Sequence, residues 1–145
     1  ELYVISNKVP AKKQKPLSRT ELMNLPLIYR EEGSGTRYVM EKFFDRKGIQ
    51  IPRKMELTSN EAVKQAVLAG LGDSIMPLIG IRNELKSGEL HIIPTQGFPI
   101  KTKWRIIWLK GKKLSPVADA YLQYIKQNKE KVLKEKFSAV HNKNL

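Results

Sequence analysis

The sequence predicts an α/β fold with a mainly parallel sheet flanked by helices. Short apolar runs alternate with helical patterns through the middle of the chain, which is the order that produces parallel strands with helical crossovers. Two strand-to-helix turns carry hydroxyl residues suited to cap the next helix, at Ser34 and at Thr58. The 145 residues, with 41% hydrophobic and 28% charged side chains, suit one domain or a small two-lobed one.

Short runs rich in β-branched and aromatic residues predict the strands, because such side chains suit a buried pleated surface. Trp104–Leu109 has the strongest strand pattern in the chain. The predicted strands are Leu2–Ile5, Pro26–Tyr29, Arg53–Leu57, Ser74–Met76, Leu90–Ile93 and Trp104–Leu109.

Capping residues and helix breakers set the predicted helix limits. Ser18 and Glu21 have the spacing of a capping box, and so have Thr58 and Glu61. Gly48 is placed to end the helix that follows the Gly33-Ser34-Gly35-Thr36 turn. The predicted helices are Arg19–Asn24, Tyr38–Gly48, Glu61–Ala69, Leu78–Leu85 and a long final helix that begins at Ser115-Pro116.

The two hydroxyl-bearing turns are the candidate binding residues. In an open parallel sheet, ligands bind at the carboxyl ends of the strands, and both turns follow strands. Free N–H groups at a helix start, with nearby hydroxyls, suit an anion or a polar ligand. The alternative is that these residues only cap helices and shape turns. The candidates are Ser34, Gly35, Thr36, Thr58, Ser59 and Asn60.

The chain is strongly basic, with a net charge of +13 from 27 Lys and Arg against 14 Asp and Glu. Lysine dominates, and aromatic residues do not alternate with the basic ones, so a base-reading surface is not predicted. The excess indicates a solvated lysine-rich surface, with weak electrostatic attraction to DNA as the alternative.

Catalytic, metal and membrane functions find little support in the sequence. Cysteine is absent and the two histidines, His91 and His141, lie far apart, so we expect no metal site, no cofactor and no enzyme activity. No apolar run approaches the ~20 residues of a membrane helix, and no membrane partner is expected. Asp73 is an unusual acid before an apolar strand, and it is interpreted either as a turn residue or as a ligand contact.

The order and spacing of several motifs resemble the effector-binding, or substrate-binding, domain of LysR-type transcriptional regulators. The resemblance extends from about Leu2 to Ile125. The motifs are Pro26-Leu-Ile-Tyr-Arg-Glu-Glu-Gly-Ser-Gly-Thr-Arg37, Thr58-Ser-Asn-Glu-Ala-Val-Lys-Gln-Ala-Val-Leu-Ala-Gly-Leu-Gly72, Ser74-Ile-Met-Pro77, Glu84-Leu-Lys-Ser-Gly-Glu-Leu90 and Ser115-Pro-Val-Ala-Asp-Ala-Tyr-Leu122.

The resemblance implies a periplasmic-binding-protein-like (type 2) fold of two lobes with a small polar or anionic effector between them. Residues 1–137 would form the effector-binding domain. Within it, residues 17–94 would be the second lobe, and residues 1–16 and 95–137 the crossover strands and final helix of an incomplete first lobe. Residues 138–145 would be a frayed tail. The chain begins at Glu1 rather than Met, so we expect it to be a piece of a longer protein.

The resemblance also implies a bacterial, cytoplasmic regulator of transcription that acts as a homo-oligomer, either a dimer or a tetramer. It would bind DNA through a winged helix-turn-helix domain that is not in this chain. The effector would meet the two hydroxyl-bearing turns. The implied dimer interface is Val39, Phe43, Arg46, Arg53 and Met55. The alternatives are an extracytoplasmic solute-binding protein of the same fold and, less favoured, an enzyme on similar lobes.

Overall fold

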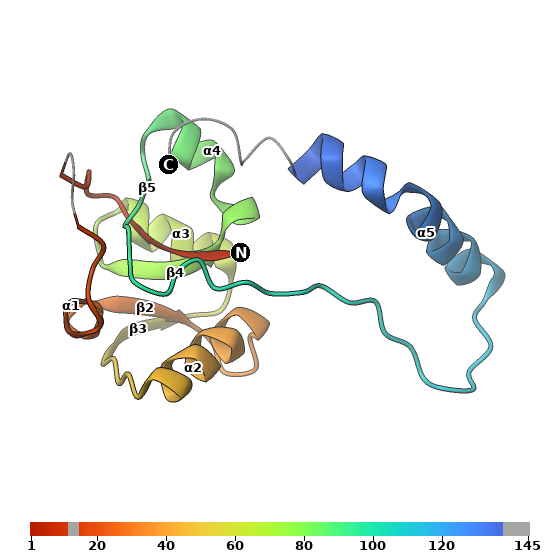
Figure 1. Cartoon of the computed structure of the whole chain (residues 1–145), viewed down its shortest axis with the longest axis horizontal. Coiled ribbons are helices and arrows are strands. Elements are labelled where there is room, and N and C mark those ends of the chain that lie inside the picture. The colour runs from red at the N-terminus through yellow and green to blue at the C-terminus, as the bar shows by residue number, and fades with distance from the viewer. Residues whose placement is uncertain (12–14, 138–145) are drawn as a thin grey trace. The chain divides into compact units, whose positions relative to one another are not determined.

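The structure is a computed structural model that describes residues 1–11 and 15–137. The chain divides into two compact units, Glu1–Lys103 and Trp104–Leu145. The first unit contains a five-stranded sheet in the order β3-β2-β4-β1-β5 (Figure 1). The strands are β1 (Leu2–Ser6), β2 (Leu27–Arg30), β3 (Arg53–Leu57), β4 (Asp73–Pro77) and β5 (His91–Ile92).

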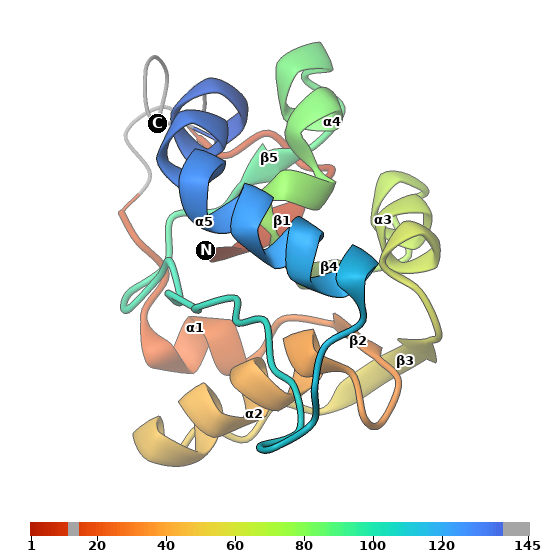
Figure 2. The same ribbon diagram turned by 90° about the vertical axis from the view of Figure 1, so that its right-hand side faces the viewer.

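The predicted α/β fold is confirmed, but its sheet is mixed and not mainly parallel as expected. Strand β2 pairs in parallel with β3 and with β4, whereas β1 runs antiparallel to β4 and to β5. Helices α1 (Arg19–Met23) and α2 (Gly35–Lys47) cover one face, and α3 (Asn60–Leu68) and α4 (Arg82–Ser87) cover the other (Figures 1 and 2). Both faces of the sheet are therefore covered at β1, β2 and β4, whereas the edge strand β3 is largely exposed.

The alternation of side chains along each strand divides the core into two layers. Leu27 and Tyr29 of β2 belong with Ile75 of β4 to the cluster that packs against α1 and α2. Ile28, between Leu27 and Tyr29, and Met76, next to Ile75, are equally buried and by the alternation point to the opposite face. This arrangement holds β2 in the middle of the fold and fixes the position of the turn that follows it.

The helix caps confirm most of the predicted helix limits. Ser18 and Glu21 form the predicted capping box, with Ser18 N–H donating to Glu21 Oε2 at 2.7 Å and Glu21 N–H donating to Ser18 Oγ at 3.3 Å. Helix α2 is capped by Ser34 and ends at Gly48, whose φ of 57° lies in the left-handed region that glycine tolerates.

Two predicted helix limits are wrong. Ser59, not Thr58, caps α3, because the Ser59 hydroxyl accepts the Ala62 N–H at 3.0 Å and α3 begins at Asn60. The predicted helix Leu78–Leu85 is divided into the 3₁₀ turn η1 (Leu78–Gly80) and α4. Ile81 separates them with a non-helical backbone, φ −128° and ψ 9°, and its side chain is fully buried.

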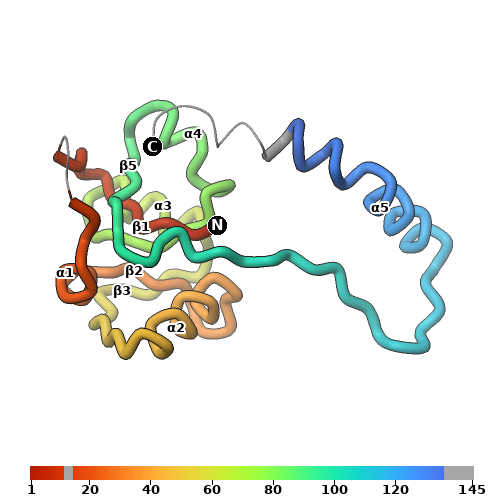
Figure 3. The backbone as a smooth tube through the Cα atoms, viewed as in Figure 1, coloured from red at the N-terminus to blue at the C-terminus, as the bar shows by residue number. Residues whose placement is uncertain are grey.

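The second unit contains α5 (Pro116–Phe137), which begins where the sequence predicts, with Ala118 N–H donating to Ser115 Oγ at 3.3 Å (Figure 3). The predicted strand Trp104–Leu109 is wrong, since no strand is formed there and Trp104 is 77% exposed. A strand is stable only with neighbours that satisfy its backbone, and none of the described residues pairs with this segment. The predicted frayed tail, 138–145, lies outside the described residues. None of the described helices is long and apolar enough to cross a membrane.

Candidate functional site at the carboxyl edge of the sheet

The parallel pairing of β2 with β3 brings the two candidate turns to one edge of the sheet. Arg30 at the end of β2 lies opposite Leu57 at the end of β3. The two chain segments stay paired beyond the strands, because Glu31 N–H donates to the Leu57 carbonyl at 3.1 Å. The turn of residues 31–36 leads into α2, and the turn of residues 58–60 leads into α3 on the other face.

The two hydroxyls of the first turn differ in their hydrogen bonds. Ser34 is buried, and its Oγ accepts the Arg37 N–H at 3.5 Å, a long cap bond that leaves the hydroxyl proton free to donate. The Thr36 hydroxyl, half-buried, makes no hydrogen bond with the residues that the structure describes. Gly35 is exposed, and a Cβ there would meet no atom within 4 Å. Both hydroxyls can therefore donate to a ligand oxygen.

The second turn has fewer hydrogen-bonding groups available to a ligand. Thr58 is exposed, whereas the Ser59 hydroxyl is used by the α3 cap. The Asn60 side chain is turned toward the first turn, because its Oδ1 accepts a hydrogen bond from Arg30 Nη1. Asn60 thus connects the start of α3 to the end of β2.

An arginine–carboxylate pair that the sequence analysis did not single out lies between these turns. Arg30 donates from Nε to Glu31 Oε2 at 2.6 Å and from Nη2 to Glu31 Oε1 at 2.7 Å. These hydrogen bonds lower the pKa of Glu31 and raise that of Arg30. The signal was a basic residue at the last position of a strand, directly before a candidate turn.

A second arginine, Arg37 in the first turn of α2, holds the candidate turn against the neighbouring elements. Its Nη1 donates to the Arg30 carbonyl at 3.2 Å and to Glu56 of β3 at 2.7 Å, and its Nε donates to Glu41 at 2.7 Å. The side chain is only 9% exposed, so these partners satisfy a largely desolvated guanidinium. The Arg37 side chain therefore connects β2, α2 and β3 next to the turn.

Asp73 lies at the opposite end of the strands from the candidate turns. It is the first residue of β4 and pairs with Leu27, the first residue of β2. The carboxyl ends of these parallel strands are at the other edge, so Asp73 is remote from the candidate turns. The alternative in which Asp73 contacts a ligand at those turns has no support from this topology.

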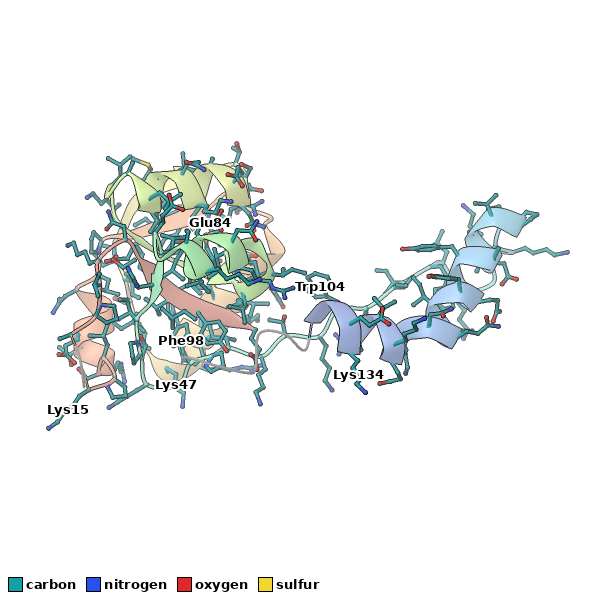
Figure 4. The ribbon with its side chains drawn as sticks, turned by 90° about the horizontal axis from the view of Figure 1, so that it is seen from above. Lys15, Lys47, Glu84, Phe98, Trp104 and Lys134 are labelled. Carbon is teal, nitrogen blue, oxygen red and sulfur yellow. The ribbon has the colours of Figure 1, made fainter. Side chains whose placement is uncertain are left out.

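The residues implied for a dimer interface divide into two groups. Val39 and Phe43 are half-buried and pack against the core of the same chain, and the Phe43 ring meets that of Phe98 edge-on at 5.1 Å (Phe98 is labelled in Figure 4). Arg46 and Arg53 are exposed, and Met55 is half-buried on β3, which is an edge strand. No group of three or more potential metal ligands occurs among the described residues.

Comparison with known proteins identifies relatives along most of the chain. The family model of the LysR substrate binding domain matches residues 2–130. A RuBisCO operon transcriptional regulator of Acidithiobacillus ferrooxidans is 42% identical over 116 residues, which cover 80% of this chain and 38% of that protein. The HTH-type transcriptional activator CmpR of Synechocystis is 43% identical over 131 residues, 90% of this chain and 43% of that protein. The chain thus spans about two fifths of the length of these curated relatives.

Solved structures share the same architecture. The Synechocystis CcmR regulatory domain in complex with 2-PG has a TM-score of 0.78 and 35% identity, covering 87% of this chain and 61% of that one. The effector-binding domain of QuiR in complex with shikimate has a TM-score of 0.69 at 21% identity, covering 90% of this chain and 62% of that one, and shows the fold alone.

Proposed function

The chain belongs to the LysR substrate-binding domain family, and from this membership we propose that it is the effector-sensing part of a LysR-type transcriptional regulator. Membership confirms the family that the sequence motifs predicted, and with it the periplasmic-binding-protein-like fold. The curated relatives are transcriptional regulators, which favours this role over a solute-binding protein or an enzyme.

The effector we propose is a small phosphorylated carboxylate, and the observation that carries it is the convergence of donors at one sheet edge. The start of α2 offers backbone N–H groups and the hydroxyls of Ser34 and Thr36, and Arg30, at the end of β2, adds a guanidinium that contacts Glu31 and Asn60. A phosphate or carboxylate group is the ligand that such donors suit. The CcmR domain, 35% identical, was solved with 2-PG (2-phosphoglycolate), and this supports the same chemistry here.

The proposed mechanism is a population shift. An effector held at this edge and against a facing lobe favours one hinge angle, because it binds the closed arrangement more tightly than the open one. In a homo-oligomeric bacterial regulator acting in the cytoplasm, that angle changes how the subunits are placed on DNA. The subunit contacts would include Val39, Phe43, Arg46, Arg53 and Met55, and DNA would be bound by another domain.

Calorimetric titration of the complete gene product with 2-phosphoglycolate tests the proposal. Ser34→Ala and Thr36→Val each remove one hydroxyl, and each should weaken binding by about fivefold, the net effect of one hydrogen bond. Ser18→Ala is the matched control, because it removes the same kind of helix cap from α1. Affinity unchanged in both turn variants, or no binding of any small phosphorylated carboxylate by the wild type, contradicts the proposed site.

A further inference from the structure

We propose that Glu31 is an internal competitor of the effector, since its carboxylate occupies the Arg30 guanidinium to which the anionic group of the effector binds. Binding of the effector would then exchange one carboxylate for another anion on Arg30 and release Glu31 toward solvent. This inference rests on the proposed function, because it specifies how the same sheet edge recognises an anion.

Arg30 holds Glu31 with the two-bond geometry by which arginine binds an anionic ligand. Glu31 bonds to Arg30 through both of its oxygens, at 2.6 and 2.7 Å, on the Nε and Nη2 side of the guanidinium. An arginine binds a carboxylate or phosphate of a ligand with this same two-bond fork. The Glu31 carboxylate therefore occupies the place that an external anion would take.

The guanidinium stays fixed when Glu31 leaves. Nη1 of Arg30 donates to Asn60 Oδ1 at the start of α3, a contact that does not involve Glu31. Arg30 is only 17% exposed, so its orientation is also limited by the surrounding protein. An incoming anion therefore meets a guanidinium that is already oriented, which reduces the entropy cost of binding.

Glu31 is the partner that can leave. Its side chain is 31% exposed, and among the described residues Arg30 is the only side chain that hydrogen-bonds to it. Arg37, the other arginine of this turn, differs because it is held at once by Glu41, Glu56 and a backbone carbonyl. An exchange at Arg30 replaces one carboxylate and leaves the bond to Asn60 in place, whereas an exchange at Arg37 would break several bonds.

The test compares Glu31→Gln with Glu32→Gln by calorimetry on the complete gene product, with 2-phosphoglycolate and inorganic phosphate as probes. Both substitutions remove one negative charge from the same turn. Glu32 is exposed and makes no hydrogen bond or ion pair with the residues that the structure describes, so it is the matched control for a general charge effect.

Glu31→Gln should tighten binding of both probes by about tenfold, the range of a hydrogen-bonded charge pair that is no longer displaced. Glu32→Gln should change affinity by less than about twofold, as for an exposed charge. Arg30→Lys keeps the charge but loses the fork, and it should weaken binding by about tenfold. Thermal unfolding of each variant confirms that the comparison concerns folded protein.

The outcomes separate this inference from the proposed function. Wild-type binding that depends on Ser34 and Thr36 but is insensitive to Glu31→Gln overturns the competitor role and leaves the effector site intact. Equal effects of the Glu31 and Glu32 substitutions also overturn it, since the gain is then only electrostatic. Absence of anion binding by both the wild type and Glu31→Gln overturns both proposals.

Discussion

Gly72 lies where the chain enters β4, and replacing it by alanine should destabilise the first unit markedly. A Cβ at this position would be 2.4 Å from the Pro26 carbonyl oxygen and 3.1 Å from Ile28 Cγ1. The oxygen cannot move freely, because it accepts the Asp73 N–H at 3.2 Å where β2 and β4 begin to pair. The backbone of one of the two strands must therefore shift.

The expected cost is about 3 kcal/mol, from about 2 for overpacking against fixed backbone and about 1 for weakening the Asp73–Pro26 hydrogen bond. Urea unfolding followed by far-ultraviolet circular dichroism measures it, with an expected fall in midpoint of roughly 1.5 M for a slope of about 2 kcal/mol per M. Tryptophan fluorescence would not serve, because Trp104 and Trp108 both lie in the second unit.

Gly80→Ala is the matched control. The nearest atom to a Cβ at Gly80 is Pro77 Cγ at 4.0 Å, an ordinary contact. The free energy of unfolding of this variant should differ from that of the wild type by less than about 0.5 kcal/mol. If Gly72→Ala unfolds at the same midpoint as Gly80→Ala, the close approach of β4 to Pro26 is wrong and the reasoning fails.

Three further substitutions test polar groups of low exposure in the first unit. Burial raises the pKa of Tyr29 to about 12, above its ordinary value of 10.0, so its contribution to stability is complete below pH 10 and is lost as pH rises from 10 to 12. Tyr29→Phe should therefore reduce the alkaline loss of unfolding free energy, by up to about 2 kcal/mol, and identical pH profiles would contradict this. Lys64 of α3 bonds to Glu84 of α4 at 2.7 Å (Glu84 is labelled in Figure 4), with side-chain exposures of 12% and 16%. Lys64→Met should cost about 2 kcal/mol in urea unfolding, because Glu84 is left partly buried without its partner, while Glu61→Gln, at an exposed partner of the same lysine, should cost under about 0.5.

The sequence predicted correctly the helix caps and helix ends that depend only on neighbouring residues. The Ser18–Glu21 box, the Ser34 cap and the left-handed Gly48 depend on residues within one turn, and all three are present. Thr58 and Ser59 are both good capping residues, and the choice between them is made by where the backbone leaves β3. That position is set by pairing with β2, which the sequence does not reveal.

Features that depend on distant partners were not predictable in this way. Trp104–Leu109 has a strand composition, but a strand forms only where another strand can pair with it. The antiparallel place of β1 between β4 and β5 follows from long-range pairing that periodicity does not encode. At the candidate site, the hydroxyls were found because capping has a local signature. The bond from Arg30 to Asn60 was missed because it joins the end of β2 to the start of α3, which are far apart in the sequence.

The place of β1 in the sheet also affects the order in which the chain can fold during synthesis. All residues of β1 are buried, and Leu2 pairs with Pro77 while Ile5 pairs with Ser74 and with Ile92. Among the five strands of this sheet, β1 is made before both of its neighbours, so its pairing within the sheet waits until β4 and β5 have been made. A newly made chain therefore completes this sheet only when β5 has emerged, and the apolar pairing that buries β1 is among the last contacts of the sheet to form.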